Sequence, residues 1–257
     1  MKKLRVLGLF LLSFTYSVFA QPSMMQPNAQ ALVDKALDVA RGNQEFQTIF
    51  FKQNEKELIR LVREGQNPQA MFIGCSDSRV VPDLIIGSKP GDLFVIRTAG
   101  NFVPPYDPQA DDGVSATIEY GIEALNVKHI IVCGHSHCGA IQGLFQDLNS
   151  EQFAIIKRWL RFGEQAKKAT LAVIDPAISK EKMYQVAEEL SVIYQLEHLM
   201  TYPFVKKRVE EGRLAIHGWY IEIETGRLLY YDIKEYRFKP VTDLLVNKNR
   251  QNLLRNY

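Results

Sequence analysis

Two short segments carry side chains that bind metals, and each follows an apolar run of the kind that forms a buried strand. The first segment, Gly-Cys-Ser-Asp-Ser-Arg, contains Cys75, Asp77 and Arg79, and the second, Gly-His-Ser-His-Cys-Gly, contains His135 and Cys138. Zinc prefers four tetrahedral ligands drawn from cysteine sulfur, histidine nitrogen and carboxylate oxygen, and a catalytic site keeps one position for water. Because Cys75, His135 and Cys138 supply three such ligands, the segments predict one zinc ion per chain.

Asp77 has two roles open to it on sequence alone. It could bind the metal as a fourth ligand and close the site, or Arg79 could hold it away so that water takes the open position. Either motif alone would be weak evidence, because a cysteine at the end of a buried strand is often only a small apolar side chain. Two such motifs, each between a β-like run and a helix-like segment, favour a metal centre.

The segments that must position these side chains alternate between strand and helix. Apolar runs at 70–74, 93–97 and 129–133 are typical of buried strands, and 112–125 has a helical apolar stripe with Asp112 as its N-cap. This alternation predicts an α/β fold, with a mostly parallel central sheet flanked by helices in a single domain. Ligands bind such sheets beyond the carboxyl ends of the strands, which is where both motifs lie.

Periodicity and turn residues outline the rest of the chain, which has no internal repeat. In the N-terminal part we expect a helix over 31–40 that is ended by Gly42, and a helix through Leu58, Leu61 and Val62 that stops at Gly65. From 151 onward we expect helices, of which 179–200 is the longest, and a break at Pro203. A strand over 214–223, a hairpin turn over 224–227 and a strand over 228–233 follow.

The N-terminus has the pattern of a cleavable secretory signal peptide over residues 1–20. Lys2, Lys3 and Arg5 precede an apolar run over 6–19, and Ala20 stands before Gln21. The run is too short, on the order of fifteen residues, to span a bilayer, although an uncleaved anchor remains the alternative. We therefore expect an exported protein, periplasmic in a Gram-negative source, whose mature domain is 21–257.

Composition limits the partners of the mature chain. The full sequence has 31 basic and 29 acidic residues, and removal of the signal peptide takes away three of the basic ones, which leaves a formal charge of about −1. Without a net positive field, we expect no binding to nucleic acid and no stable membrane insertion after signal cleavage.

The third cysteine and the remaining histidines lack the spacing of metal ligands. Cys133 lies in the apolar run at 129–133 and is interpreted as core packing. His137 stands between two ligands in the sequence, where it could transfer protons or be a solvated residue in the first turn of a helix. We interpret His129, His198 and His217 as structural.

These residues together resemble the signature of the β-class carbonic anhydrases, zinc enzymes that interconvert carbon dioxide and bicarbonate. The resemblance begins at Gly42-Asn43 and extends through Gln66 to both motifs. Its other matching segments are 90–97, 100–105, 118–120 and 218–228. It implies a mostly parallel sheet with helices around it, and a dimer or tetramer whose sites lie at the interface between subunits.

The resemblance also implies a mechanism, the attack of zinc-bound hydroxide on carbon dioxide, which gives bicarbonate and a proton reversibly. In this mechanism Asp77 accepts a hydrogen bond from the hydroxide, and Arg79 holds Asp77 in a charge-assisted pair. Gln66 would donate a hydrogen bond to a substrate oxygen. Four further residues would shape a small apolar pocket: Phe94, Ala99, Tyr120 and Gly139.

Two positions distinguish this chain within the family. Some members carry a Val-His-x-Asp segment where bicarbonate binds and inhibits, whereas this chain has Val103-Pro104-Pro105-Tyr106. It therefore resembles the plant-like group, in which water occupies the fourth zinc position, and we expect an open site. Ala99 replaces the larger aliphatic residue of many relatives, which changes the expected size of the pocket.

Two other functions remain compatible with the same residues. The first is hydrolysis of CS₂ or COS on the same scaffold, which the sequence separates poorly from hydration of carbon dioxide. The second is a zinc-stabilised interaction protein in which Asp77 permanently completes a closed tetrahedron. Arg79 and Gln66 argue against the second function, because a structural zinc site needs neither of them.

Overall fold

A computed structural model describes residues 27–109, 111–148 and 151–244, with side chains from residue 31 onward. The chain divides into two compact units, Met1–Ile59 and Arg60–Tyr257. The predicted signal peptide over 1–20 lies outside the described residues. Among the described residues, no helix combines the length and the apolar character needed to cross a membrane.

The described part of the first unit, residues 27–59, is helical. It contains α1 (Pro27–Glu45), the π-helical turn η2 (Phe46–Phe51) and the beginning of α2 (Lys52–Glu64). The predicted helix end at Gly42 is wrong, because α1 continues through this glycine to Glu45. A single glycine costs a helix only about 1 kcal/mol relative to alanine, which the neighbouring helix-forming residues offset. The predicted stop at Gly65 is confirmed, since this glycine has a φ of 83° directly after α2.

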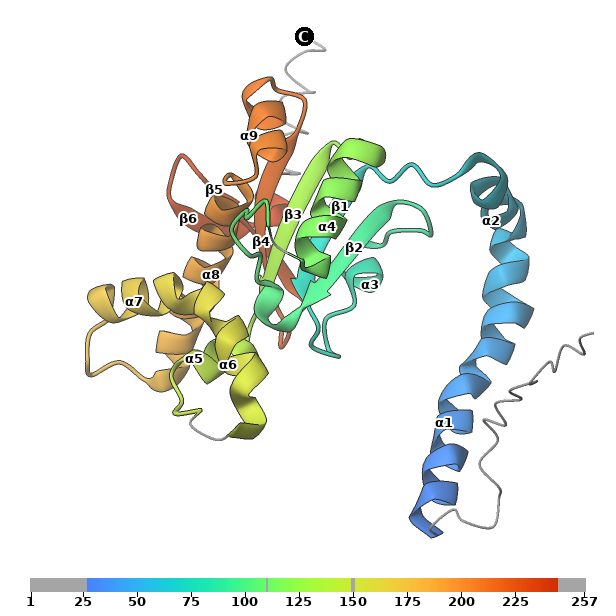
Figure 1. The fold of residues 1–257 in the computed structure, drawn as a ribbon, viewed down its shortest axis with the longest axis horizontal. Helices are drawn as coiled ribbons and strands as arrows, with labels where there is room; N and C mark the ends of the chain where they lie inside the picture. Colours follow the sequence, from blue (N-terminus) through green and yellow to red (C-terminus); the bar gives the residue numbers. More distant parts are fainter. Residues whose placement is uncertain (1–26, 110, 149–150, 245–257) are drawn as a thin grey trace, which may run out of the picture. The chain divides into compact units, whose positions relative to one another are not determined.

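The second unit is built on a six-stranded sheet (Figure 1). The strand order is β2-β1-β3-β4-β5-β6, in which the first four strands are parallel and the last two pair antiparallel. This arrangement confirms the predicted α/β fold with a mostly parallel sheet. The strands are β1 (Ala70–Cys75), β2 (Leu93–Thr98), β3 (His129–His135), β4 (Ala215–Glu222), β5 (Arg227–Asp232) and β6 (Arg237–Pro240).

Helices and short turns connect the strands. The α-helices are α3 (Pro82–Ile86), α4 (Gly113–Glu119), α5 (Gly139–Leu144), α6 (Ala154–Leu160), α7 (Glu164–Val173), α8 (Lys180–Leu199) and α9 (Pro203–Glu210). The shorter turns are η3 (Ala99–Asn101), η4 (Tyr120–Ala124), η5 (Glu151–Phe153) and η6 (Arg161–Gly163).

Two predicted helix boundaries are set by the side chain or the backbone of the residue at the boundary. Asp112 caps α4 as predicted, because its carboxylate accepts hydrogen bonds from the backbone N–H groups of Val114 and Ser115, each at 2.9 Å. Pro203 separates two helices as expected, and it also begins α9, since the missing N–H of proline is tolerated in a first turn. The sequence patterns missed α9 itself and the short edge strand β6.

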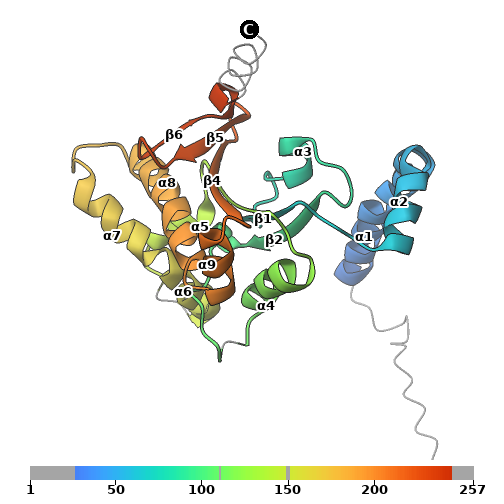
Figure 2. The ribbon, with the colours of Figure 1, turned by 90° about the horizontal axis from the view of Figure 1, so that it is seen from above.

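Alternate residues of the central strands face opposite sides of the sheet, as the pleat requires. Met71 and Ile73 of β1 belong to a core that includes buried residues of α8 and α9 on one side. Phe72 of β1 and Cys133 of β3 belong to a second core on the other side, against Ile85 of α3. Figure 2 shows α4, α8 and α9 on one face of the sheet and α3 on the other.

Candidate metal centre

The three predicted metal ligands meet at the carboxyl ends of two adjacent parallel strands. Cys75 is the last residue of β1, His135 is the last residue of β3, and Cys138 is the N-cap of α5. One ligand atom from each lies within 4.8 Å of the other two, and the two Sγ atoms are 4.0 Å apart. We call these three residues the metal cluster, which is the only such group of metal-binding side chains within the described part of the chain.

The chain between His135 and Cys138 is held in a tight turn by the β4–β5 hairpin. Ser136 Oγ donates a hydrogen bond to the Glu224 carboxylate at 2.7 Å and accepts one from the Ile223 backbone N–H at 2.9 Å. His137 has a φ of 56°, a left-handed conformation that non-glycine residues rarely adopt. The turn therefore brings His135 and Cys138 to one point although they are only three residues apart.

Burial and mutual contact polarise the two thiols of the metal cluster. The hydrogen bond from the Cys138 thiol lowers the pKa of Cys75 to about 4, and the backbone N–H groups of Asp77 and Gly100 approach the Cys75 sulfur at 3.4 Å. The same contact, together with burial, raises the pKa of Cys138 well above its ordinary value. Both sulfurs must be deprotonated to bind a metal cation, so metal binding at this pair would release protons.

The two ring nitrogens of His135, the histidine of the metal cluster, have different environments. His135 Nδ1 lies 2.9 Å from the Ser136 carbonyl oxygen, and because a carbonyl only accepts, this nitrogen carries the proton. His135 Nε2 is buried and has no hydrogen-bond partner. Since an orphaned buried nitrogen is costly, its free lone pair beside two cysteine sulfurs fits a zinc ligand.

Asp77 lies beside the metal cluster but is held by Arg79. The Arg79 guanidinium donates to both carboxylate oxygens, at 2.9 and 2.8 Å, and the Arg79 backbone N–H donates at 3.0 Å. These hydrogen bonds hold the pKa of Asp77 well below its usual range. Arg79 also donates to the His137 carbonyl oxygen at 3.1 Å, so it ties the two motifs together.

The structure places two of the predicted pocket residues next to the metal cluster. Gly139 follows Cys138 directly, and a side chain there would meet no atom within 4 Å. Ala99 precedes Gly100, whose backbone N–H approaches the Cys75 sulfur, and the Ala99 carbonyl oxygen accepts a hydrogen bond from the Trp159 indole at 2.8 Å. Both residues therefore border the space beside the predicted zinc site.

Three other predicted pocket residues do not reach the metal cluster of their own chain. Phe94 pairs with Met71, four residues before the end of β1, which is about 13 Å along the strand. The half-exposed Tyr120 lies against Phe94, with ring centroids 5.9 Å apart. Gln66 is exposed in the segment that precedes β1.

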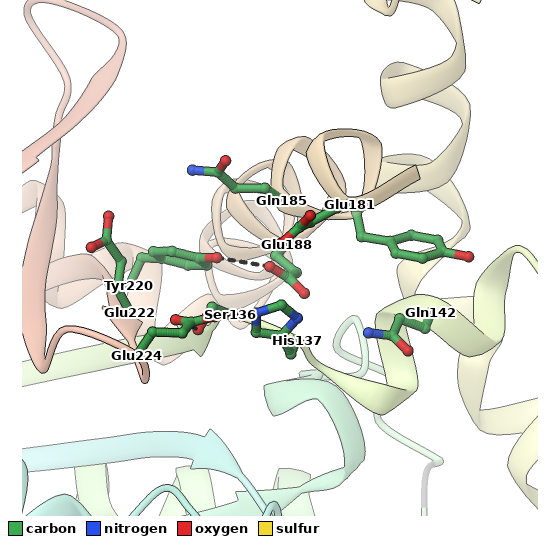
Figure 3. A pocket seen from close by; sticks show the side chains of 10 residues that line it. Ser136, His137, Gln142, Glu181, Gln185, Glu188, Tyr220, Glu222 and Glu224 are labelled. Atoms are coloured by element: carbon green, nitrogen blue, oxygen red, sulfur yellow. Dashed lines mark hydrogen bonds and ion pairs between the residues drawn. The ribbon is translucent and has the colours of Figure 1, made fainter. Parts of the chain in front are cut away.

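A cavity of about 410 Å³ is lined in part by Ser136 and His137, the two residues between His135 and Cys138 (Figure 3). His137 lines it, and its Nε2 atom contacts a carboxylate oxygen of Glu224. Glu188 lines it as well, and burial raises the pKa of this carboxyl to about 6. The other lining residues are Ser136, Gln142, Glu181, Tyr184, Gln185, Tyr220 and Glu222.

Comparison with known proteins identifies the family. A family model described as carbonic anhydrase matches residues 70–228, a segment that contains the whole metal cluster. The solved β-carbonic anhydrase CcaA is 40% identical with a TM-score of 0.76, over 80% of this chain and 92% of CcaA. The chain belongs to the β-carbonic anhydrase family. Hydration of carbon dioxide is the general reaction of this family of enzymes.

Other β-carbonic anhydrases and carbonic anhydrases are similar over the same region. A carbonic anhydrase of Synechocystis is 42% identical over 193 residues, which are 74% of this chain and 69% of that relative. One of two tetrameric β-carbonic anhydrases from the filamentous ascomycete Sordaria macrospora is 29% identical with a TM-score of 0.68, over 77% of this chain and 96% of the relative.

Two residues that contact the candidate metal centre of this β-carbonic anhydrase were missed by sequence reasoning. Arg97 of β2 donates to the carbonyl oxygens of Cys75 at 3.0 Å and of Asp77 at 2.7 Å, and so holds the backbone of the first motif. Glu188 of α8 accepts a hydrogen bond from the Cys138 backbone N–H at 2.9 Å. Both residues contact partners far apart in the chain, so no local sequence pattern signalled them.

Proposed function

We propose that this chain catalyses the reversible hydration of carbon dioxide to bicarbonate and a proton, with one zinc ion held by Cys75, His135 and Cys138. The convergence of these three donor atoms within 4.8 Å is the observation that carries the proposal. When bound, zinc supplies the Lewis acidity that lowers the pKa of a water molecule from about 15.7 to about 7, a shift for which carbonic anhydrase is itself the reference case.

Asp77 and Arg79 orient the attacking group. The Asp77 carboxylate stays ionised at neutral pH because Arg79 holds its pKa low, so it acts only as a hydrogen-bond acceptor. It accepts the O–H of the attacking oxygen and leaves the lone pair of that oxygen facing the carbon of carbon dioxide. The guanidinium occupies both carboxylate oxygens, which keeps Asp77 out of the fourth ligand position and the site open.

A second copy of the chain completes the substrate pocket. Gln66, Phe94 and Tyr120 lie away from the metal cluster of their own chain, and the family resemblance places active sites at subunit interfaces. The tetrameric relative from Sordaria macrospora supports an oligomer, here a dimer or a tetramer. In this arrangement the amide of Gln66 donates to a substrate oxygen, and the two aromatic rings exclude water from the carbon dioxide site.

The test is a stopped-flow assay of carbon dioxide hydration on protein of measured zinc content. Asp77→Asn is expected to lower kcat/KM by about 10- to 100-fold while one zinc per chain is retained. The exposed Asp111→Asn, a matched change outside the site, is expected to behave as the wild type. A zinc-loaded wild type without hydration activity contradicts the proposal and leaves the structural-zinc interpretation. Faster turnover of COS or CS₂ than of carbon dioxide favours the related hydrolase.

Residues 1–20 direct this enzyme out of the cytoplasm. The basic residues followed by an apolar run and Ala20 support cleavage before Gln21. Expression of the full chain in a Gram-negative host, followed by N-terminal sequencing of the periplasmic fraction, tests this. A chain beginning at Gln21 is expected, and a full-length chain confined to the cytoplasm contradicts export.

A further inference from the structure

Glu188 is a buried carboxylate whose two oxygens connect three separate parts of the fold. It lies on α8 with an exposed fraction of 3%. Oε1 accepts the backbone N–H of Cys138 at 2.9 Å, and Oε2 accepts the hydroxyl of Tyr220, on β4, at 2.7 Å. Figure 3 shows the Tyr220 hydroxyl directed at the Glu188 carboxylate.

The position of this carboxylate is costly for the fold. Its helix neighbours Ala187, Ser191 and Val192 are also buried, so the carboxylate has lost nearly all of its contact with bulk water. A buried carboxylate is tolerated only where hydrogen bonds replace its lost hydration. The two hydrogen bonds of this carboxylate link Tyr220 to Cys138 through Glu188.

The backbone N–H that Glu188 holds belongs to a metal ligand at a point where the chain changes direction. Cys138 is the N-cap of α5, with the extended backbone angles φ −70° and ψ 115°. The other end of the tight turn is held by the Ser136 contacts with Ile223 and Glu224. Arg79 holds the carbonyl side of the His137–Cys138 peptide, and Glu188 holds its N–H side.

We propose that Glu188 is a positioning residue of the metal centre, which fixes the Cys138 sulfur relative to Cys75 and His135 through the Cys138 backbone N–H. Tyr220 in turn holds the carboxylate in place. This inference rests on the proposed zinc site, but it concerns how tightly and in what geometry the metal is held rather than the reaction. Partners that orient ligands in this way typically change metal affinity by about 10- to 100-fold when they are removed.

Substitutions of Glu188 distinguish the effect of its hydrogen bonds on the place of Cys138 from the effect of its negative charge. Glu188→Gln has the same shape, and its amide can accept from the Cys138 N–H through oxygen and donate to the Tyr220 oxygen through nitrogen. If position matters, this variant keeps the wild-type affinity for zinc. Glu188→Ala removes both contacts and is expected to weaken zinc binding by about 10-fold or more. The matched control is Glu189→Ala. The Glu189 carboxylate accepts a hydrogen bond from Gln185 on the same helix.

The experiment measures zinc affinity of the metal-free chain by competition with a chelator, and records the absorption spectrum of the cobalt-substituted protein. For Glu188→Ala we expect the weaker affinity together with a changed thiolate-to-cobalt band, since the Cys138 sulfur moves. For Glu188→Gln and Glu189→Ala we expect the wild-type spectrum and an affinity within about threefold of wild type. Thermal unfolding of the metal-free variants shows whether they fold. If a substitution changes only the geometry of the metal site, the Tm of the metal-free protein stays the same.

Several outcomes would overturn the proposal. Glu188→Ala with wild-type affinity and spectrum would show that the contact has no effect on the metal. Glu188→Gln as weak as Glu188→Ala would show that charge, not position, is what the site needs. If Glu188→Ala does not fold, Tyr220→Phe decides, since it is expected to weaken zinc binding at least about threefold and unchanged affinity contradicts the inference. A wild type that binds zinc but does not hydrate carbon dioxide would refute the proposed function and leave this inference standing.

Discussion

Gly134 is the residue of β3 directly before the ligand His135, and the structure leaves no room there for a side chain. A methyl group at this position would lie 2.6 Å from Val192 Cγ2 on α8. Val192 is fully buried, and its branched side chain has one preferred rotamer in a helix, so it cannot turn aside. Gly134→Ala should therefore push the strand that carries His135 away from α8.

The magnitude follows from two opposing effects. Overpacking of a filled core costs about 1–3 kcal/mol, and replacing glycine by alanine in a strand returns about 0.5–1 kcal/mol. We expect Gly134→Ala to lower the free energy of unfolding by about 1–2 kcal/mol, which for a unit of this size is roughly 2–8 °C in Tm. Val192→Ala alone removes two buried methyl groups and should cost about 2 kcal/mol.

The assay is a double-mutant cycle measured by denaturant unfolding at one fixed protein concentration. In the Val192→Ala background the clash is gone, so the added Gly134→Ala should cost nothing or stabilise slightly. Gly143→Ala in α5 is the control, because its methyl group would meet Leu160 Cδ1 at an ordinary 3.4 Å. Costs of Gly134→Ala and Val192→Ala that simply add would refute the reasoning.

Three further predictions test separate parts of the account. Cys133→Ala should leave zinc stoichiometry unchanged, by metal analysis, because Cys133 is fully buried in a core without ligand contacts and burial raises the pKa of its thiol to about 12. Arg79→Lys should lower kcat about 10-fold with zinc retained, because a point charge cannot hold both oxygens of Asp77. Burial lowers the pKa of His198 below its ordinary 6.5, so the unfolded chain takes up the proton first. The stability of the metal-free protein, measured by thermal unfolding, should therefore fall as the pH drops below about 6.5. The decrease should be smaller for His198→Gln.

The sheet and the metal cluster could be predicted from sequence because their signals are local. Strands of a buried parallel sheet are continuous apolar runs, and ligands at strand ends meet wherever the strands are neighbours. Asp112 and Gly65 mark helix ends by their own chemistry, and both predictions are confirmed. Gly42 has the same residue type as Gly65 but lies inside a helix, since glycine alone does not end one.

Contacts between distant parts of the chain could not be predicted in this way. Glu188 meets Cys138 across 50 positions, and no local pattern distinguishes it from its neighbour Glu189. Arg97 reads as the end of a strand, although it holds the backbone of the first motif. The roles proposed for Gln66, Phe94 and Tyr120 require a second copy of the chain, so they stay predictions.

The most direct test of the central claim is a zinc titration of the metal-free protein in which the rate of carbon dioxide hydration is followed. We expect the rate to rise linearly from near zero and to reach a plateau at one zinc per chain. With Cys75→Ser and Cys138→Ser combined, no zinc-dependent rise is expected. A metal-free chain that already hydrates carbon dioxide at the full rate, or a double variant with the wild-type titration curve, would contradict the account.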